Sequence, residues 1–210
     1  MKNLKCIFFD IGYTLINEDD VWERRCIEQA EMDDVKMLNI SHKEIYEEII
    51  QASMAYQPQY RTVVKKFGFL KSAPYRHEFE KLYDKVEFVL QALSQKYKLG
   101  IIANQADGLA DRLSSWGILK YFSFIISSWD NQIMKPDLKL FQIALEQSGY
   151  MPYETVMIGD RLDNDIFPAK TIGMKTIWIK QGFGGMQKPK TEEYLPDIEI
   201  KNLSELLNIL

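Results

Sequence analysis

Short apolar runs recur along the chain, and within them apolar residues follow one another without alternating with polar ones. Continuous runs of this kind are typical of strands in a parallel sheet that helices cover on both faces. The pattern predicts strands over residues 6–10, 99–104, 122–128, 155–160 and 174–179.

Helical patterns separate several of these runs. Apolar residues at helical spacing predict helices over residues 109–116 and 138–145, and Gly117 and Gly149 follow where a helix C-cap favours a left-handed residue. Residues 180–197 are expected to form a loop. Strands that alternate with helices predict an α/β fold with a doubly wound, Rossmann-like parallel sheet.

Residues 16–88 break this alternation, because the pattern indicates no strand there. Ser41 and Glu44 form a capping-box sequence ahead of apolar residues at helical spacing. The charged segments 21–32 and 77–97 also have a helical pattern. The whole stretch is therefore expected to be helical.

We divide the chain into a core of residues 1–15 and 89–210 and a helical cap of residues 16–88. A chain of 210 residues, 46% hydrophobic and 27% charged, is long enough for one core domain with a small insertion. Helical insertions in α/β enzymes often act as lids over the active site.

The net charge and the lengths of the apolar runs argue against several classes of protein. A formal net charge of -4 gives no electrostatic reason to expect nucleic acid or an anionic membrane as a partner. No apolar run approaches the roughly 18 residues of a membrane span, and no secretory signal is apparent.

Cys6 and Cys26 are too few for a disulfide framework, which predicts reduced thiols and a cytoplasmic protein. His42 and His77 lack nearby cysteines and are expected at the surface, not as zinc ligands.

Polar residues follow four of the predicted strands, at the carboxyl ends where open α/β sheets bind ligands. They are Asp10, Asn104, Lys135 and the acidic run GDRLDND at residues 159–165. Any one of them has an ordinary explanation, such as a turn cap or a solvated charge, and Asp163 is expected to be a solvated loop acid. Four groups at one edge of the sheet indicate a site.

In order and spacing, these residues resemble the motifs of the haloacid dehalogenase-like (HAD) hydrolase superfamily. The family's first motif, Asp-x-Asp-x-Thr after an apolar strand, is matched by Asp10, Gly12 and Thr14. Its second motif ends in Ser or Thr, commonly followed by Asn, and is matched by Ala103 and Asn104.

The resemblance continues through the third and fourth motifs. Lys135-Pro136 matches a Lys-Pro pair ahead of a helix, and Gly159-Asp160 with Asp165 matches Gly-Asp followed by a second acid. The helical insertion resembles the family's C1 cap. The resemblance covers essentially the whole chain.

The resemblance implies a site chemistry. Asp10 would attack phosphorus and form an aspartyl-phosphate, while Lys135 would neutralise negative charge. Mg²⁺ would be held by Asp10, the main-chain carbonyl of Gly12, Asp160 and Asp165. Thr14 would brace the loop after the nucleophile, and the phosphate-binding residues would be Asn104 and Thr14.

Two positions depart from the family pattern. Gly12 stands where phosphatases of the family carry the aspartate that transfers a proton, and loss of such a group costs about 10²–10⁴ in rate. Ala103 lacks the hydroxyl that normally bonds the phosphate. We therefore expect weak or selective activity that favours aryl and acyl phosphates, whose leaving groups need no proton. Gly12→Asp is expected to raise the turnover of alkyl esters.

The sequence favours a Mg²⁺-dependent phosphatase that acts on a small phosphorylated metabolite. One alternative is a 2-haloacid dehalogenase, a branch that also lacks the second aspartate but needs no metal. Another is a non-catalytic or regulatory protein that binds a phosphorylated ligand. The substrate and the oligomeric state are not readable from the sequence.

Overall fold

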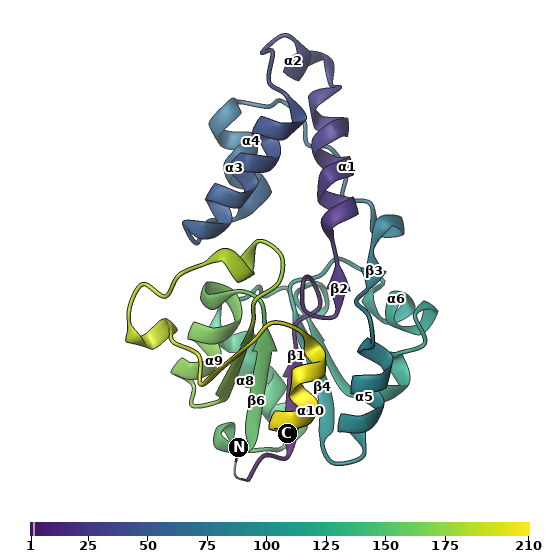
Figure 1. Ribbon diagram of the computed structural model, residues 1–210, viewed down its shortest axis with the longest axis vertical. Helices are drawn as coiled ribbons and strands as arrows, with labels where there is room; N and C mark the ends of the chain where they lie inside the picture. Colours follow the sequence, from purple (N-terminus) through teal and green to yellow (C-terminus); the bar gives the residue numbers. More distant parts are fainter. Residues whose placement is uncertain (2) are drawn as a thin grey trace.

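A computed structural model describes residue 1 and residues 3–210 (Figure 1). Its centre is a parallel sheet of six strands in the order β5-β4-β1-β6-β7-β8. The strands are β1 (Cys6–Phe9), β4 (Lys98–Ala103), β5 (Phe122–Ser127), β6 (Thr155–Gly159), β7 (Lys175–Ile179) and β8 (Ile198–Ile200). The predicted strands are confirmed to within one residue at each end, and β8 is an edge strand that the pattern did not indicate.

Helices cover both faces of the sheet, so the doubly wound α/β fold is confirmed. Ile7 and Phe9 of β1 lie in one apolar cluster, whereas Cys6 and Phe8 lie in another on the opposite face. Burying a side chain of this size stabilises the fold by about 1.5–3 kcal/mol. The helices on the first face are α5 (Val86–Ser94), α6 (Leu109–Ser115) and α10 (Leu206–Ile209), and those on the second are α8 (Leu138–Ser148) and α9 (Phe167–Thr171).

Four helices stand over the carboxyl ends of the strands (Figure 1). They are α1 (Asp19–Ala30), α2 (Asp33–Lys36), α3 (His42–Met54) and α4 (Gln59–Phe67). The predicted capping box is present, since the Ser41 hydroxyl accepts from the Glu44 N–H and the Glu44 carboxylate accepts from the Ser41 N–H. The helices share an apolar cluster that includes Trp22, Ile45 and Tyr60 and extends to Tyr13 and Phe183.

A short antiparallel ribbon of β2 (Ile16–Asn17) and β3 (Lys81–Leu82) connects these helices to the sheet. The prediction of no strand in this region is wrong, because a strand of two residues is too short to show a pattern. The helix predicted over residues 77–97 is shorter in the structure, where α5 is the α-helix of that segment. Residues 81–82 pair with β2, and Lys85 has a left-handed backbone (φ 65°) directly ahead of the helix.

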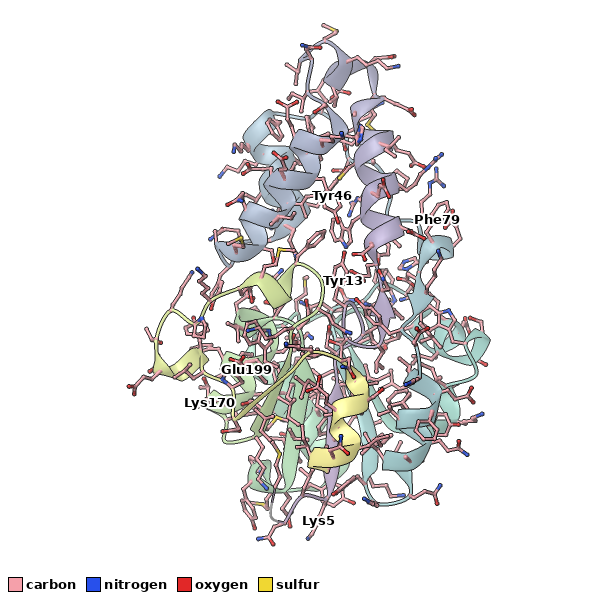
Figure 2. All side chains as sticks on the ribbon, viewed as in Figure 1. Lys5, Tyr13, Tyr46, Phe79, Lys170 and Glu199 are labelled. Carbon is pink, nitrogen blue, oxygen red and sulfur yellow. The ribbon has the colours of Figure 1, made fainter. Side chains whose placement is uncertain are left out.

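Aromatic side chains join the two layers. Phe183, from the loop after β7, contacts Tyr13 of the core at 5.2 Å between ring centroids, Trp22 of α1 at 5.6 Å and Tyr46 of α3 at 5.4 Å. Figure 2 shows Tyr13 and Tyr46 on the two sides of this junction. In the described part of the chain, no helix has the length and apolar character that crossing a bilayer requires.

Candidate active site

Asp10 lies directly beyond β1, where its N–H donates to the Ile158 carbonyl of β6 at 2.9 Å. The Lys135 ammonium donates to Asp10 Oδ1 at 2.6 Å and to Asp165 Oδ1 at 2.5 Å. Only 5% of Lys135 is exposed. Burial alone would lower the pKa of Lys135, but the two carboxylates raise it above its ordinary value, so the side chain is a fixed cation.

Asn104 holds the backbone of Lys135 in place. Its side-chain oxygen accepts from the Lys135 N–H at 2.7 Å, and its side-chain nitrogen donates to the Lys135 carbonyl at 3.0 Å. Both ends of the amide are therefore engaged with one residue. Asn104 also lines the cleft that contains Asp10.

Asp160 and Asp165 lie beyond β6, where a single π-helical turn (Leu162–Ile166) begins. The Arg161 N–H donates to Asp165 Oδ2 at 3.0 Å, which turns this carboxylate back over the end of the strand. A Cβ atom on Gly159 would lie 2.4 Å from Asp165 Cγ, so the close approach requires glycine there.

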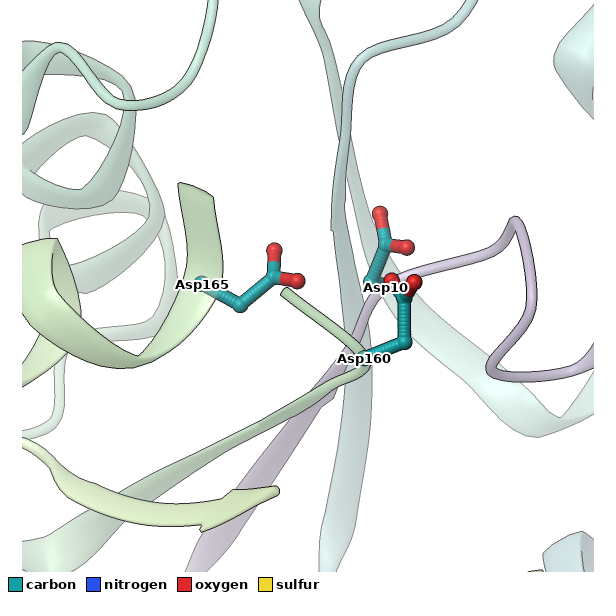
Figure 3. A group of neighbouring side chains, drawn as sticks. All are labelled: Asp10, Asp160 and Asp165. Atoms are coloured by element: carbon teal, nitrogen blue, oxygen red, sulfur yellow. The ribbon is translucent and has the colours of Figure 1, made fainter. Parts of the chain in front are cut away.

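The carboxylates of Asp10, Asp160 and Asp165 gather in one buried group, with ligand atoms within 4.8 Å of one another (Figure 3). Burial and the neighbouring carboxylates raise the pKa of Asp160 well above its ordinary range. Burial also raises the pKa of Asp165 to about 6, although Lys135 partly offsets this. The group holds more negative charge than Lys135 compensates, and its oxygen donors are those that Mg²⁺ prefers, so these residues fit a divalent cation.

Comparison with known proteins supports the same assignment. The family model of the haloacid dehalogenase-like hydrolases matches residues 7–179. The chain belongs to this family. A glyceraldehyde 3-phosphate phosphatase from Methanocaldococcus jannaschii is 30% identical over 234 residues, which cover 99% of this chain and 97% of that enzyme.

Solved structures of the HAD family have the same fold. A HAD phosphatase from Thermococcus onnurineus is 25% identical with a TM-score of 0.68, over 98% of this chain and 97% of its own. The HAD hydrolase YfnB from Bacillus subtilis, solved bound to magnesium, is 24% identical with a TM-score of 0.74, over 100% of this chain and 99% of its own. The resemblance seen in the four sequence motifs is therefore confirmed at the level of the family.

The remaining residues of the first HAD motif lie in different surroundings. Gly12 lines the cleft beside Asp10. Thr14 is fully buried in the turn after β1, and its N–H donates to the Ile11 carbonyl at 3.2 Å. Its hydroxyl has no hydrogen-bond partner among the described residues. Thr14 is not among the residues that line the cleft.

Glu18 is a site residue that the sequence analysis missed. A Cβ atom on Gly12 would lie 2.6 Å from Glu18 Oε1, so the Glu18 carboxyl group covers this glycine. The Trp22 indole donates to Glu18 Oε2 at 3.0 Å, and the Tyr75 hydroxyl lies 2.7 Å from Oε1. Burial raises the pKa of Glu18 to about 7. The sequence offered one signal for Glu18. The first HAD motif lacks its second acid at Gly12, and Glu18 is an acid a few residues beyond this motif.

The cleft has a volume of about 770 Å³ and is lined from both layers. Asp10, Lys135 and Asp160 form its core side, and Tyr56 and His77 contribute from the other layer. His77 is partly buried here instead of standing free at the surface.

Asp163 is wrongly predicted as a solvated acid. Its carboxylate is partly buried, accepts from the Arg161 guanidinium at 2.6 and 3.0 Å, and accepts from the Gln187 side chain at 2.9 Å. Gln187 also donates to the Ser53 carbonyl at the end of α3 at 2.8 Å. Asp163 therefore belongs to a polar link between the core and the helices above it.

Proposed function

We propose that the protein is a Mg²⁺-dependent phosphatase that acts on a small phosphorylated metabolite through an aspartyl-phosphate intermediate on Asp10. The observation that carries this proposal is the buried cluster of three carboxylates around the Lys135 ammonium. An aspartate held between a cation and two further acids suits attack on an anionic phosphate once the excess negative charge is compensated.

In the proposed reaction, a carboxylate oxygen of Asp10 attacks phosphorus while the bond from phosphorus to the leaving oxygen breaks. The Lys135 ammonium, 2.6 Å from Asp10 Oδ1, stabilises negative charge on the transferring group. Mg²⁺ held by Asp10, the Gly12 carbonyl, Asp160 and Asp165 would supply the positive charge that offsets repulsion between carboxylate and phosphate. Water then cleaves the aspartyl-phosphate and releases inorganic phosphate.

Asn104 and Thr14 take supporting roles in this proposal. Because both ends of its amide bond the Lys135 backbone, Asn104 fixes the position of the ammonium group beside the phosphate. Thr14 braces the turn after the nucleophile from its buried position.

We propose that helices α1–α4 form the cap of this enzyme and select its substrate, because Trp22 of α1, Gln59 of α4 and Tyr56 of the turn between α3 and α4 line the same cleft as Asp10. A small phosphate ester suits a cleft of about 770 Å³. A cytoplasmic location remains a prediction. The dehalogenase alternative has less support, because a reaction without metal does not require two further buried carboxylates around the nucleophile.

The deciding experiment compares wild type and Asp10→Asn on a panel of aryl, acyl and sugar phosphates, with Mg²⁺ and with EDTA. We expect wild type to release phosphate only with Mg²⁺, and Asp10→Asn to release none. Asp111→Asn, an exposed substitution on α6, is the matched control and should retain activity. Halide release from 2-haloacids that persists in EDTA would instead support a dehalogenase.

Metal binding is tested separately by thermal unfolding. Mg²⁺ at 100-fold excess over its Kd should stabilise wild type by about 2.7 kcal/mol. Asp160→Asn should remove most of this response while raising the stability of the metal-free protein, because one of three mutually repelling carboxylates is lost. An unchanged response to Mg²⁺ in Asp160→Asn would exclude the cluster as the metal site.

A further inference from the structure

We infer that the Glu18 carboxyl group is the proton-transfer catalyst of this site, in the place of the aspartate that related phosphatases carry two residues after the nucleophile. This inference rests on the proposed phosphatase function. It answers the question of what replaces the acid that Gly12 cannot supply.

The first argument is steric. A Cβ atom on Gly12 would lie 2.6 Å from Glu18 Oε1, 3.0 Å from Cδ and 3.2 Å from Oε2. Real Cβ atoms do not approach oxygen so closely, so any larger residue at position 12 would displace the Glu18 carboxyl group. The space that a side chain at position 12 would enter is already filled by a carboxyl group from position 18.

The second argument is access. Glu18 lies between β2 and α1, where the chain leaves the core, and its side chain lines the same cleft as Asp10 and Lys135. Its other contacts hold it there, since Oε2 accepts from the Trp22 indole at 3.0 Å. The carboxyl group is thus fixed beside Gly12 in the cleft that contains Asp10.

The third argument is orientation. The Tyr75 hydroxyl donates to Glu18 Oε1 at 2.7 Å and lies 3.1 Å from Glu80 Oε1. Because the Trp22 indole donates to Oε2, both oxygens of Glu18 are held, and the carboxyl group keeps one orientation beside Gly12.

The charged neighbours of the two carboxyl groups differ. Glu80 contacts the Arg112 guanidinium at 3.3 Å and His77 Nδ1 at 2.8 Å. Among the described residues, no cationic side chain forms an ion pair with Glu18. Of the two, Glu18 is therefore the carboxyl group that lacks a cationic partner, which suits a residue that gives up and regains a proton during the reaction.

Glu18 accounts for the proton that moves in each of the two steps, the attack by Asp10 and the hydrolysis of the aspartyl-phosphate. When Asp10 attacks, the bond from phosphorus to the leaving oxygen breaks, and that oxygen takes the Glu18 proton to leave as an alcohol. Glu18 is then a carboxylate. It removes a proton from the water whose oxygen attacks phosphorus, which regenerates the Asp10 carboxylate and the protonated Glu18 and releases phosphate.

The main test measures the dependence on the leaving group in Glu18→Gln, which keeps the shape of the side chain but cannot transfer the proton. We expect turnover of an alkyl phosphate to fall by about 10²–10⁴. With nitrophenyl phosphate, whose leaving group needs no proton, the variant should release one equivalent of nitrophenol rapidly and accumulate phosphoenzyme, because the second step still lacks its base. Glu23→Gln, an exposed change further along α1, should leave both substrates unaffected.

A pair of substitutions keeps the inference testable if Glu18→Gln folds poorly. Gly12→Asp alone is now expected to lower activity, contrary to the gain that the sequence suggested, because the two carboxyl groups collide. In combination with Glu18→Ala, the Gly12→Asp change has room for its side chain. The double variant should therefore restore alkyl ester turnover above that of Glu18→Ala alone.

Two results would overturn the inference while leaving the proposed function intact. The first is Asp10-dependent turnover of alkyl phosphates at the wild-type rate in Glu18→Gln. The second is an equal loss on both substrates in Glu18→Gln without accumulation of phosphoenzyme. If wild type itself released no phosphate in an Asp10-dependent manner, the proposed function would fail and this inference with it.

Discussion

The contacts of individual buried ionisable residues determine which chemistry this site supports. Lys135 contacts two carboxylates, whereas Glu18 contacts only neutral donors, Trp22 and Tyr75. A buried carboxyl group without a cation is stable mainly in its neutral form. Glu18 therefore reduces stability whenever it ionises, which is typical of a residue kept for chemistry.

Glu18→Gln is accordingly expected to stabilise the metal-free protein at alkaline pH. The folded pKa of Glu18 is about 7 against an ordinary 4.5, so the folded state binds more protons between these values and wild-type stability falls as pH rises through them. Glutamine does not titrate. The variant should match wild type near pH 4.5 and exceed it by about 3 kcal/mol above pH 7. Denaturant unfolding at about pH 5 and about pH 8 would measure this, and an equal difference at both would refute it.

The sequence analysis correctly predicted that most of the charged site residues lie at one edge of the sheet. Asp10, Lys135, Asp160 and Asp165 each follow an apolar strand, and parallel strands end at one edge. Glu18 was not predicted as a site residue because no motif includes it. Only the fold of the segment between β1 and β2 brings it over Gly12, and that contact has no spacing rule in the sequence.

At the scale of elements, continuous apolar runs identified the central strands because each is buried on both faces. Strands β2 and β3 were missed, since two residues show no periodicity, and β8 was missed as a short edge strand. The helical pattern over 77–97 was misleading because charged residues at helical spacing do not exclude a turn and a strand. Pairing of Lys81 and Leu82 with β2 overrides that local preference.

The turn after β6 is the element that the site depends on most. Gly159→Ala would place a Cβ atom 2.4 Å from Asp165 Cγ and push that carboxylate away from Lys135. We expect a loss of stability of about 1–3 kcal/mol and a weakened thermal response to Mg²⁺. Thermal unfolding with and without Mg²⁺ would show both effects, and a variant with a wild-type response would contradict this account of the turn.

The whole molecule is two layers that share one cleft, so their contact surface governs how the cleft is shaped. Phe183 is the aromatic side chain that contacts Tyr13 of the core, Trp22 of α1 and Tyr46 of α3. Gln187 adds a polar link between the same layers. The loop after β7 thus sets the position of α1 and α3 over the sheet.

Phe183→Ala should therefore affect binding as well as stability. We expect a loss of about 3–5 kcal/mol in the free energy of unfolding, and a higher KM with a smaller change in kcat. Phe88→Ala is the matched control, because Phe88 is 60% exposed on α5 and should change neither. Destabilisation at Phe183 with an unaltered KM would mean that the junction does not position α1 and α3 for substrate binding.

The contact between Gly12 and Glu18 has a consequence for the interpretation of other sequences. Because the two side chains compete for one volume, positions 12 and 18 should vary together during evolution. A relative with an aspartate at the first position should carry a small or differently directed residue at the second. A relative with Asp-x-Gly in its first motif and an acid eight residues after the nucleophile should then be counted as a working phosphatase, although its motif alone suggests an inactive one.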